Sequence, residues 1–166
     1  MRIAVVGGTG YVGLTTAVCL AAKGHMVFCV GRNREKIERI RKGFPVLYER
    51  GLKNLLDEVL AKRTLIATVD LESAIQNSNV SFICVGTPSR NDGSIDLTEI
   101  RDAAKQIGCA LRDKVDYHVV VVKSTVVPGT TEDVILPILE EFSGKKVGID
   151  FGICMNPEFL REGRAI

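Results

Sequence analysis

The chain has 166 residues, with 46% hydrophobic and 25% charged residues and a formal net charge of +2. This length is enough for one domain with its own hydrophobic core. A net charge close to zero gives no support to a nucleic-acid or membrane-surface partner, and no apolar run approaches the length of a membrane span. We therefore expect one globular domain that binds neither nucleic acid nor membrane.

The cysteines and histidines show no metal-site or disulfide spacing. The five cysteines are scattered through apolar runs, which predicts buried free thiols in a reducing compartment, and hence a cytoplasmic protein. They are Cys19, Cys29, Cys84, Cys109 and Cys154. The two histidines, His25 and His118, stand at the entrances of predicted strands, and we interpret both as structural.

The first thirteen residues carry the strongest functional signal. Residues 3–6 are a short apolar run, typical of a strand buried on both faces, and a helix is predicted from Leu14 to Ala22. Between them, the spacing of Gly8, Gly10 and Gly13 fits the dinucleotide-binding pattern G-x-G-x-x-G. The first glycine would permit the tight turn, the second would let a pyrophosphate approach, and the third would let the helix pack on the strand.

The alternative is a glycine turn in a doubly wound sheet that binds nothing. A P-loop is excluded, because Leu14 stands where that motif needs its lysine. The predicted cofactor-binding residues of this loop are Gly8, Thr9, Gly10, Tyr11, Val12 and Gly13.

Strand and helix patterns alternate along the rest of the chain. Further strands are predicted at 26–30, 64–69, 80–85, 119–122 and within 147–154. Helices are predicted at 34–42, 52–62 and 71–76, from Asp96 or Thr98 to about Arg112, and up to about Phe142. The alternation predicts an α/β fold: a Rossmann-type, doubly wound, mainly parallel sheet with helices on both faces.

Three polar loops follow predicted strands. They contain residues 86–88, 123–125 and 156–158. Turn chemistry alone could account for any one of them, but ligands of such sheets bind beyond the carboxyl ends of the strands. Three polar loops beside a glycine loop therefore favour a site.

The last loop is predicted to open a final turn of helix, with Pro157 at its first position. Glu158 and Glu162 would then share one helix face, where a carboxylate could accept a proton. The alternative is two surface glutamates that the helix dipole favours near a helix start.

Five stretches together resemble the UDP-glucose/GDP-mannose dehydrogenase family, in the family's order and over the whole length. They are Gly8–Gly13, Tyr48–Leu52, Val85–Pro88, Lys123–Val126 with Gly129-Thr130, and Asn156–Gly163. The last stretch is the most specific. Within the family, the chain is most similar to members that act on UDP-glucose.

The resemblance implies roles for individual residues. The glycine loop, Val85, Gly86, Thr87, Pro88, Ser124 and Thr125 would bound a nicotinamide dinucleotide, NAD or NADP. Thr125 and Glu158 would position the water and the sugar C6 during oxidation. Phe159, Leu160 and Glu162 would lie between substrate and nicotinamide, with Arg161 also on the substrate side.

The resemblance also implies a reaction larger than this chain. The family oxidises a nucleotide sugar twice at C6, here UDP-glucose to UDP-glucuronate for polysaccharide synthesis. A cysteine in a later Gly-Gly-x-Cys-x-Pro-Lys-Asp motif holds the intermediate, and neither that motif nor the family's sugar-binding central helix is found here. We therefore expect residues 1–166 to be the cofactor half of a longer homo-oligomeric enzyme, able to bind dinucleotide but not to turn over alone.

One departure from the family concerns the choice of cofactor. Gly31 stands where the family has an acidic residue that binds the ribose hydroxyl of NAD, and Arg32 and Lys36 follow it. Glycine would remove the repulsion of a 2′-phosphate and leave space, Arg32 or Arg34 could pair with that phosphate, and Asn33 could still hydrogen-bond a ribose hydroxyl. The alternative is that both arginines are solvated charges at the start of a helix. These residues predict that NADP is accepted at least as well as NAD.

Two other functions fit part of the sequence. An atypical short-chain NADP reductase would suit the first 33 residues, but its Tyr-x-x-x-Lys pair is missing, because Thr15, Leu52 and Val121 stand four residues after the three tyrosines. A non-catalytic NAD(P)-sensing module would fit the length. It gives no reason for residues 123–125 or for Glu158 and Glu162.

Overall fold

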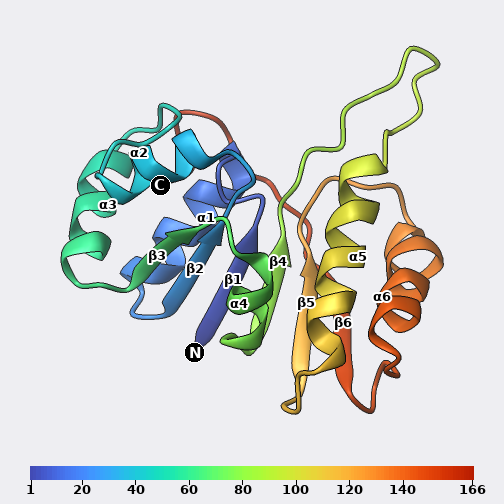
Figure 1. Ribbon diagram of the computed structural model, residues 1–166. Helices are drawn as coiled ribbons and strands as arrows, with labels where there is room; N and C mark the ends of the chain where they lie inside the picture. Colours follow the sequence, from blue (N-terminus) through green and yellow to red (C-terminus); the bar gives the residue numbers. More distant parts are fainter.

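The computed structural model describes residues 1–166, which form a six-stranded sheet in the order β3-β2-β1-β4-β5-β6 (Figure 1). The strands are β1 (Arg2–Val6), β2 (Met26–Val30), β3 (Leu65–Thr68), β4 (Val80–Ile83), β5 (His118–Val122) and β6 (Phe151–Met155). Every neighbouring pair is parallel. The order reverses between β1 and β4, which is where a doubly wound sheet binds its ligands.

Helices cover both faces of the sheet, as predicted. They are α1 (Tyr11–Ala22), α2 (Arg34–Arg41), α3 (Leu52–Ala61), α4 (Leu71–Gln76), α5 (Thr98–Arg112) and α6 (Leu136–Ser143), the last preceded by a π-helical turn, η1 (Thr131–Ile135). Helices α1 and α3 pack beside β1–β3, whereas α5 and α6 pack together on the other half of the sheet (Figure 1). The Rossmann-type fold is therefore confirmed.

Strand β1 shows why the core has this form. Ala4 and Val6 belong to the apolar cluster under α4, α5 and α6, whereas Ile3 and Val5 belong to the cluster under α1, α2 and α3. Alternate side chains of a strand point to opposite faces, so a strand covered on both faces must be apolar at every position. The continuous run at residues 3–6 is the consequence.

The largest differences from the prediction lie at the start of α1 and after β6. Helix α1 begins at Tyr11 rather than Leu14, directly after Gly10, whose extended backbone (φ −88°, ψ 171°) ends the turn. The predicted final helix is wrong: residues 156–161 have no regular secondary structure. The amides of Leu160, Gly163 and Ala165 donate to glutamate side chains and so do not make helical bonds.

All five cysteines are free, but only some are buried. Cys29 and Cys84 are buried, as expected, whereas Cys109 on α5 and Cys154 on β6 are exposed. The prediction of buried thiols fails for these two because α5 has a solvent face and β6 is an edge strand without a partner on its outer side.

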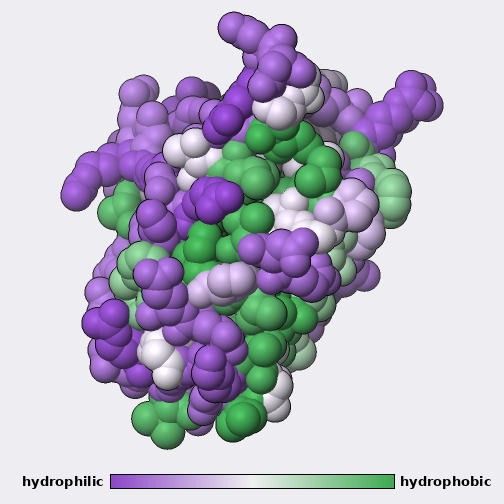
Figure 2. All heavy atoms as spheres, turned by 90° about the vertical axis from the view of Figure 1, so that its right-hand side faces the viewer, coloured by the Kyte–Doolittle hydropathy of each residue, from purple (hydrophilic) through white to green (hydrophobic).

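The side of the molecule at α6 and β6 carries a hydrophobic band bordered by hydrophilic residues (Figure 2). Ile149 and Met155, near the two ends of β6, are both exposed. None of the helices combines the length and apolar character needed to cross a membrane.

Candidate dinucleotide site

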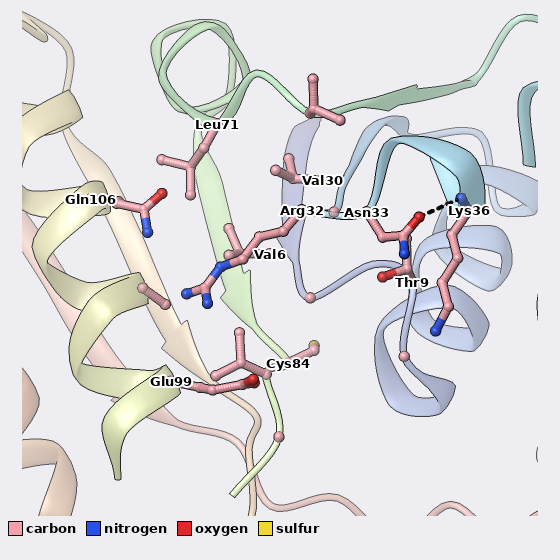
Figure 3. A pocket seen from close by; sticks show the side chains of 17 residues that line it. Val6, Thr9, Val30, Arg32, Asn33, Lys36, Leu71, Cys84, Glu99 and Gln106 are labelled. Carbon is pink, nitrogen blue, oxygen red and sulfur yellow. Dashed lines mark hydrogen bonds between the residues drawn. The ribbon is translucent and has the colours of Figure 1, made fainter. Parts of the chain in front are cut away.

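A cavity of about 290 Å³ opens at the carboxyl edge of the sheet, between β1 and β4. Its walls come from the ends of β1, β2 and β4 and from one face of α5 (Figure 3). Of the predicted cofactor residues, it brings together Thr9, Gly10, Gly31, Arg32, Lys36, Val85 and Gly86. It also brings in Asn33, and residues that the sequence did not reveal, among them Leu71, Glu99 and Gln106.

The glycines of the turn have separate steric reasons. Gly7, with φ +90°, has a backbone conformation that favours glycine, and a Cβ there would lie 2.4 Å from the Cys84 carbonyl oxygen. A Cβ on Gly13 would lie 2.2 Å from the Gly7 carbonyl oxygen, so the third motif glycine does permit close packing of helix on strand. A Cβ on Gly8 would lie 2.5 Å from the Cys29 sulfur. The tight turn was predicted for Gly8, but the left-handed residue is Gly7.

Gly10 is different, because the nearest protein atom to its hypothetical Cβ is the Gly7 carbonyl oxygen at 3.4 Å. The space above it is open to a ligand. The start of α1, which follows, has no side-chain cap and no acidic residue in its first turn. Unpaired N–H groups and the positive end of the helix dipole make this a place where an anion such as a pyrophosphate fits.

Two cations without carboxylate partners stand at the cavity. Neither Arg32 nor Lys36 takes part in any of the five ion pairs of the structure. The Arg32 side chain extends into the cavity, toward the side of Glu99 and Gln106, and Lys36 lies on the side of Thr9 (Figure 3). Asn33 caps α2, since its Oδ1 accepts from the Lys36 amide at 2.9 Å, which leaves its side-chain NH₂ free.

The space expected at Gly31 is filled by Thr9. A Cβ on Gly31 would lie 2.4 Å from Thr9 Cγ2 and 3.2 Å from Ile37 Cδ1. The prediction that glycine leaves room here is therefore wrong. A side chain at Gly31 requires Thr9 to move.

The loops after β4 and β5 are tied to each other. Thr87 Oγ1 donates to the Thr125 carbonyl oxygen at 2.6 Å, and Ser124 Oγ donates to the Val85 carbonyl oxygen at 2.7 Å. Ser124 is buried, so its hydroxyl holds the two loops together, whereas Thr125 is exposed at the edge. Thr87 and Pro88 lie beyond the lining of the cavity.

Residues 156–166, here called the C-terminal segment, cross the same edge of the sheet. The segment begins where Lys123 Nζ donates to Asn156 Oδ1 at 3.1 Å. Glu158 Oε2 accepts from the Leu160 amide at 2.9 Å. The pKa of the Cys84 thiol is raised to about 12, chiefly by burial; the Lys123 charge opposes this rise and the Glu158 charge adds to it, so both charges lie near the end of β4.

Glu158 and Glu162 do not share a helix face, contrary to the prediction. Glu162 lies instead at a second cavity, of about 560 Å³, with Thr9, Gly10 and Tyr11. This cavity meets the first at the glycine turn, since Thr9, Gly10 and Lys36 line both. Phe159 is 91% exposed, and the Arg161 side chain is also in solvent.

Tyr11 and Glu49 form a contact that the sequence did not reveal. Tyr11 Oη donates to Glu49 Oε2 at 2.6 Å, and the amides of Gly163 and Ala165 donate to the same carboxylate at 2.7 and 3.1 Å. Burial and this hydrogen bond raise the pKa of Tyr11 to about 12, and the Tyr11 bond lowers the pKa of Glu49. Glu49 belongs to one of the family-like stretches, but no spacing rule links it to residues more than a hundred positions away.

His118 has a structural role, as interpreted. His118 is buried, with its ring nitrogens 3.2 Å from the Ser78 carbonyl oxygen and 3.0 Å from Ser81 Oγ. Burial lowers the pKa of His118 to about 4, which keeps the ring neutral. His25 Nδ1 contacts the N-terminal amine at 3.4 Å.

Comparison with known proteins gives the same fold. The GDP-mannose 6-dehydrogenase of Pseudomonas aeruginosa is 48% identical over 166 residues, and the UDP-glucose 6-dehydrogenase of Haloferax volcanii is 45% identical. Each match covers the whole of this chain but 38% of the relative, so the chain spans well under half of their length.

Two solved structures superpose closely. A ternary complex of GDP-mannose dehydrogenase from Pseudomonas aeruginosa matches with a TM-score of 0.97 and 47% identity, over 99% of this chain and 38% of that one. A UDP-glucose dehydrogenase from Pyrobaculum islandicum matches with a TM-score of 0.92 and 42% identity, over 98% and 37%. The model of the UDP-glucose/GDP-mannose dehydrogenase family, NAD binding domain, matches residues 1–166, and the chain belongs to that family.

Proposed function

We propose that this chain is the dinucleotide-binding half of a nucleotide-sugar 6-dehydrogenase that oxidises the C6 alcohol of a UDP- or GDP-linked hexose to a carboxylate. The observation that carries the proposal is the convergence of three features at one edge of the sheet. These are the uncapped start of α1, the joined loops after β4 and β5, and the C-terminal segment with its two glutamates. We further propose that the intact enzyme is a cytoplasmic homo-oligomer.

The place of each residue at this edge suggests its role. The start of α1 at Gly10 would hold the pyrophosphate, and Arg32 and Lys36 would hold the ribose and its phosphate. A nicotinamide held here would supply the hydride acceptor for oxidation at C6. Glu158, near the end of β4, would take the proton directly or through water, with Thr125 across the same edge. Glu162 would lie beside the nicotinamide, and Phe159, Leu160 and Arg161 would meet the sugar nucleotide.

We propose that NADP is accepted at least as well as NAD. The support is electrostatic, because Arg32 extends into the cavity without an acidic partner and Lys36 stands nearby. Asn33 still offers an NH₂ donor to a ribose hydroxyl, so NAD is retained.

The test is titration of both cofactors into the wild type and Arg32→Ala, with Arg101→Ala on α5 as the matched loss of an exposed arginine. Arg32→Ala should lose NADP affinity about tenfold, about 1.4 kcal/mol, and NAD affinity much less. A wild type that prefers NAD tenfold would contradict the proposal.

Gly31→Asp is a weaker test, because the Thr9 methyl occupies the path of the new side chain. The double substitution Thr9→Ala with Gly31→Asp removes that collision. It should lower NADP affinity relative to Thr9→Ala alone, which is the matched background.

The activity itself is tested by cofactor reduction with UDP-glucose and GDP-mannose in the intact enzyme. Steady reduction of two cofactors per sugar by one of them would support the proposal and choose the sugar. Dinucleotide binding without turnover of either sugar in the intact protein would favour the sensing module. The 166-residue chain alone should bind dinucleotide and leave both sugars unoxidised.

A further inference from the structure

The carboxylate of Glu49 is buried without a cation. It is 5% exposed, and none of the five ion pairs includes it. A buried charge of this kind is costly unless hydrogen bonds satisfy it. The three donors described above do so, and together with the lowered pKa they keep the group ionised.

The donors come from two distant places. Tyr11 is the first residue of α1, directly after Gly10 of the phosphate-binding turn. Gly163 and Ala165 lie 114 and 116 positions from Glu49, in the C-terminal segment. Tyr11 Oη also lies 3.0 Å from the Arg161 carbonyl oxygen. One carboxylate therefore joins the turn to the segment.

The outer half of the segment has no other hydrogen bond to the rest of the molecule. Its remaining backbone bond, from the Arg164 amide to the Arg161 carbonyl oxygen, is internal. The inner half is held separately, where the Asn156 amide donates to the Val122 carbonyl oxygen. Because Glu162 lies between Arg161 and Gly163, the contacts on both sides fix it at the second cavity, beside Gly10 and Tyr11.

We propose that Glu49 is a positioning residue: together with Tyr11 it fastens residues 161–165 against the start of α1, and so holds Glu162 at the second cavity, beside the glycine turn. The role assigned to Glu162 rests on the proposed function, whereas the fastening does not. Glu49 itself lines neither cavity.

The first test is amide hydrogen exchange on the 166-residue chain without cofactor. Glu49→Gln leaves one side-chain oxygen for three donors, and Tyr11→Phe removes only the hydroxyl. Both should speed exchange at Gly163 and Ala165 by about tenfold or more, while the amides of β1 and β4 stay protected. Tyr117→Phe and Glu141→Gln, exposed residues away from the segment, are the matched controls and should change neither. Unchanged exchange at Gly163 and Ala165 in both variants overturns the fastening.

The second test uses turnover in the intact enzyme. Glu49→Gln should lower kcat about tenfold while KM for the dinucleotide stays within about threefold, since neither Arg32 nor Lys36 is among the hydrogen-bond partners of Glu49. If Glu49 acts through Glu162, adding Glu49→Gln to the Glu162→Gln enzyme should lower kcat no further. If the two losses of kcat multiply in the double variant, the positioning role is overturned. An intact wild type that oxidises neither sugar refutes the proposed function, and the exchange result still decides the fastening.

Discussion

The glycine turn at residues 7–13 and the C-terminal segment lie at the same edge of the sheet, yet different forces fix their shapes. The turn is set by steric contacts with β2, β4 and its own backbone, with a left-handed residue at Gly7. The segment has no regular structure and is held by side chains, chiefly Glu49 from the loop before α3. A substitution that crowds the turn should therefore lower the free energy of unfolding, whereas a substitution in the segment should lower kcat.

Of the effects that distinguish the turn from the C-terminal segment, we expect the largest on substitution of Glu158. Glu158→Gln should lower kcat of the intact enzyme by about 10²–10⁴-fold, the usual size of a general acid–base contribution. Stability should change by less than about 0.5 kcal/mol, because a glutamine oxygen can still accept from the Leu160 amide. Turnover within a few-fold of the wild type would leave Glu158 as a residue that only shapes the segment. Glu141→Gln, an exposed glutamate on α6, is the control.

In the turn, Gly13→Ala should destabilise the fold itself. The added Cβ meets the backbone of Gly7 at 2.2 Å, and neither helix α1 nor strand β1 can withdraw without opening the core. We expect a loss of about 3 kcal/mol in the free energy of unfolding, measured by urea denaturation of the 166-residue chain. A loss below about 1 kcal/mol would mean that the turn is more adaptable than the segment, reversing the comparison.

This difference explains how far the sequence could be read. Strand β1, the glycine spacing and helices α2 to α5 follow from periodicity and local sterics, and their predicted positions agree with the structure to within about two residues. Pro157 is a good first residue for a helix, so the local signal there pointed to one. The contacts that set the shape of the segment join Glu49 to Gly163 and Ala165, and local pattern does not contain them.

Likewise, only part of the cavity lining could be predicted from the sequence. Its backbone wall belongs to a motif, whereas Glu99 and Gln106 enter from the face of α5, where nothing in the helical pattern marks them as different from other exposed polar residues. The filled space at Gly31 depends on the Thr9 rotamer, which the sequence does not state.

Within the turn, Gly10→Ala should lower dinucleotide affinity without lowering the free energy of unfolding. The new Cβ comes no closer than 3.4 Å to any protein atom, and the backbone of Gly10 suits alanine. Unfolding free energy should stay within about 0.5 kcal/mol, while dinucleotide affinity should fall about tenfold because the methyl occupies the path of the pyrophosphate. Isothermal titration beside the urea experiment checks both. Unchanged affinity would show that the phosphates lie elsewhere.

The smallest effect is a pH dependence of the contact between the two regions. The pKa of Tyr11 is raised to about 12, mainly by burial and then by the hydrogen bond to Glu49, so the folded protein holds this proton more tightly than the unfolded chain does. The stability that comes from Tyr11 is complete below the unfolded value of about 10 and is lost as the pH rises from there toward 12.

The pKa of Glu49 moves the other way, so its contribution is present above about 4.3 and is lost as the pH falls through the lowered value. The segment should thus be held between these limits and released outside them. The difference in phenolate absorbance between the wild type and Tyr11→Phe isolates the Tyr11 titration, and Glu49→Gln should shift that titration to lower pH. If Tyr11 titrated near 10 in the folded wild type, the hydroxyl would be hydrogen-bonded to water instead of Glu49. The turn and the segment would then be fixed independently of each other.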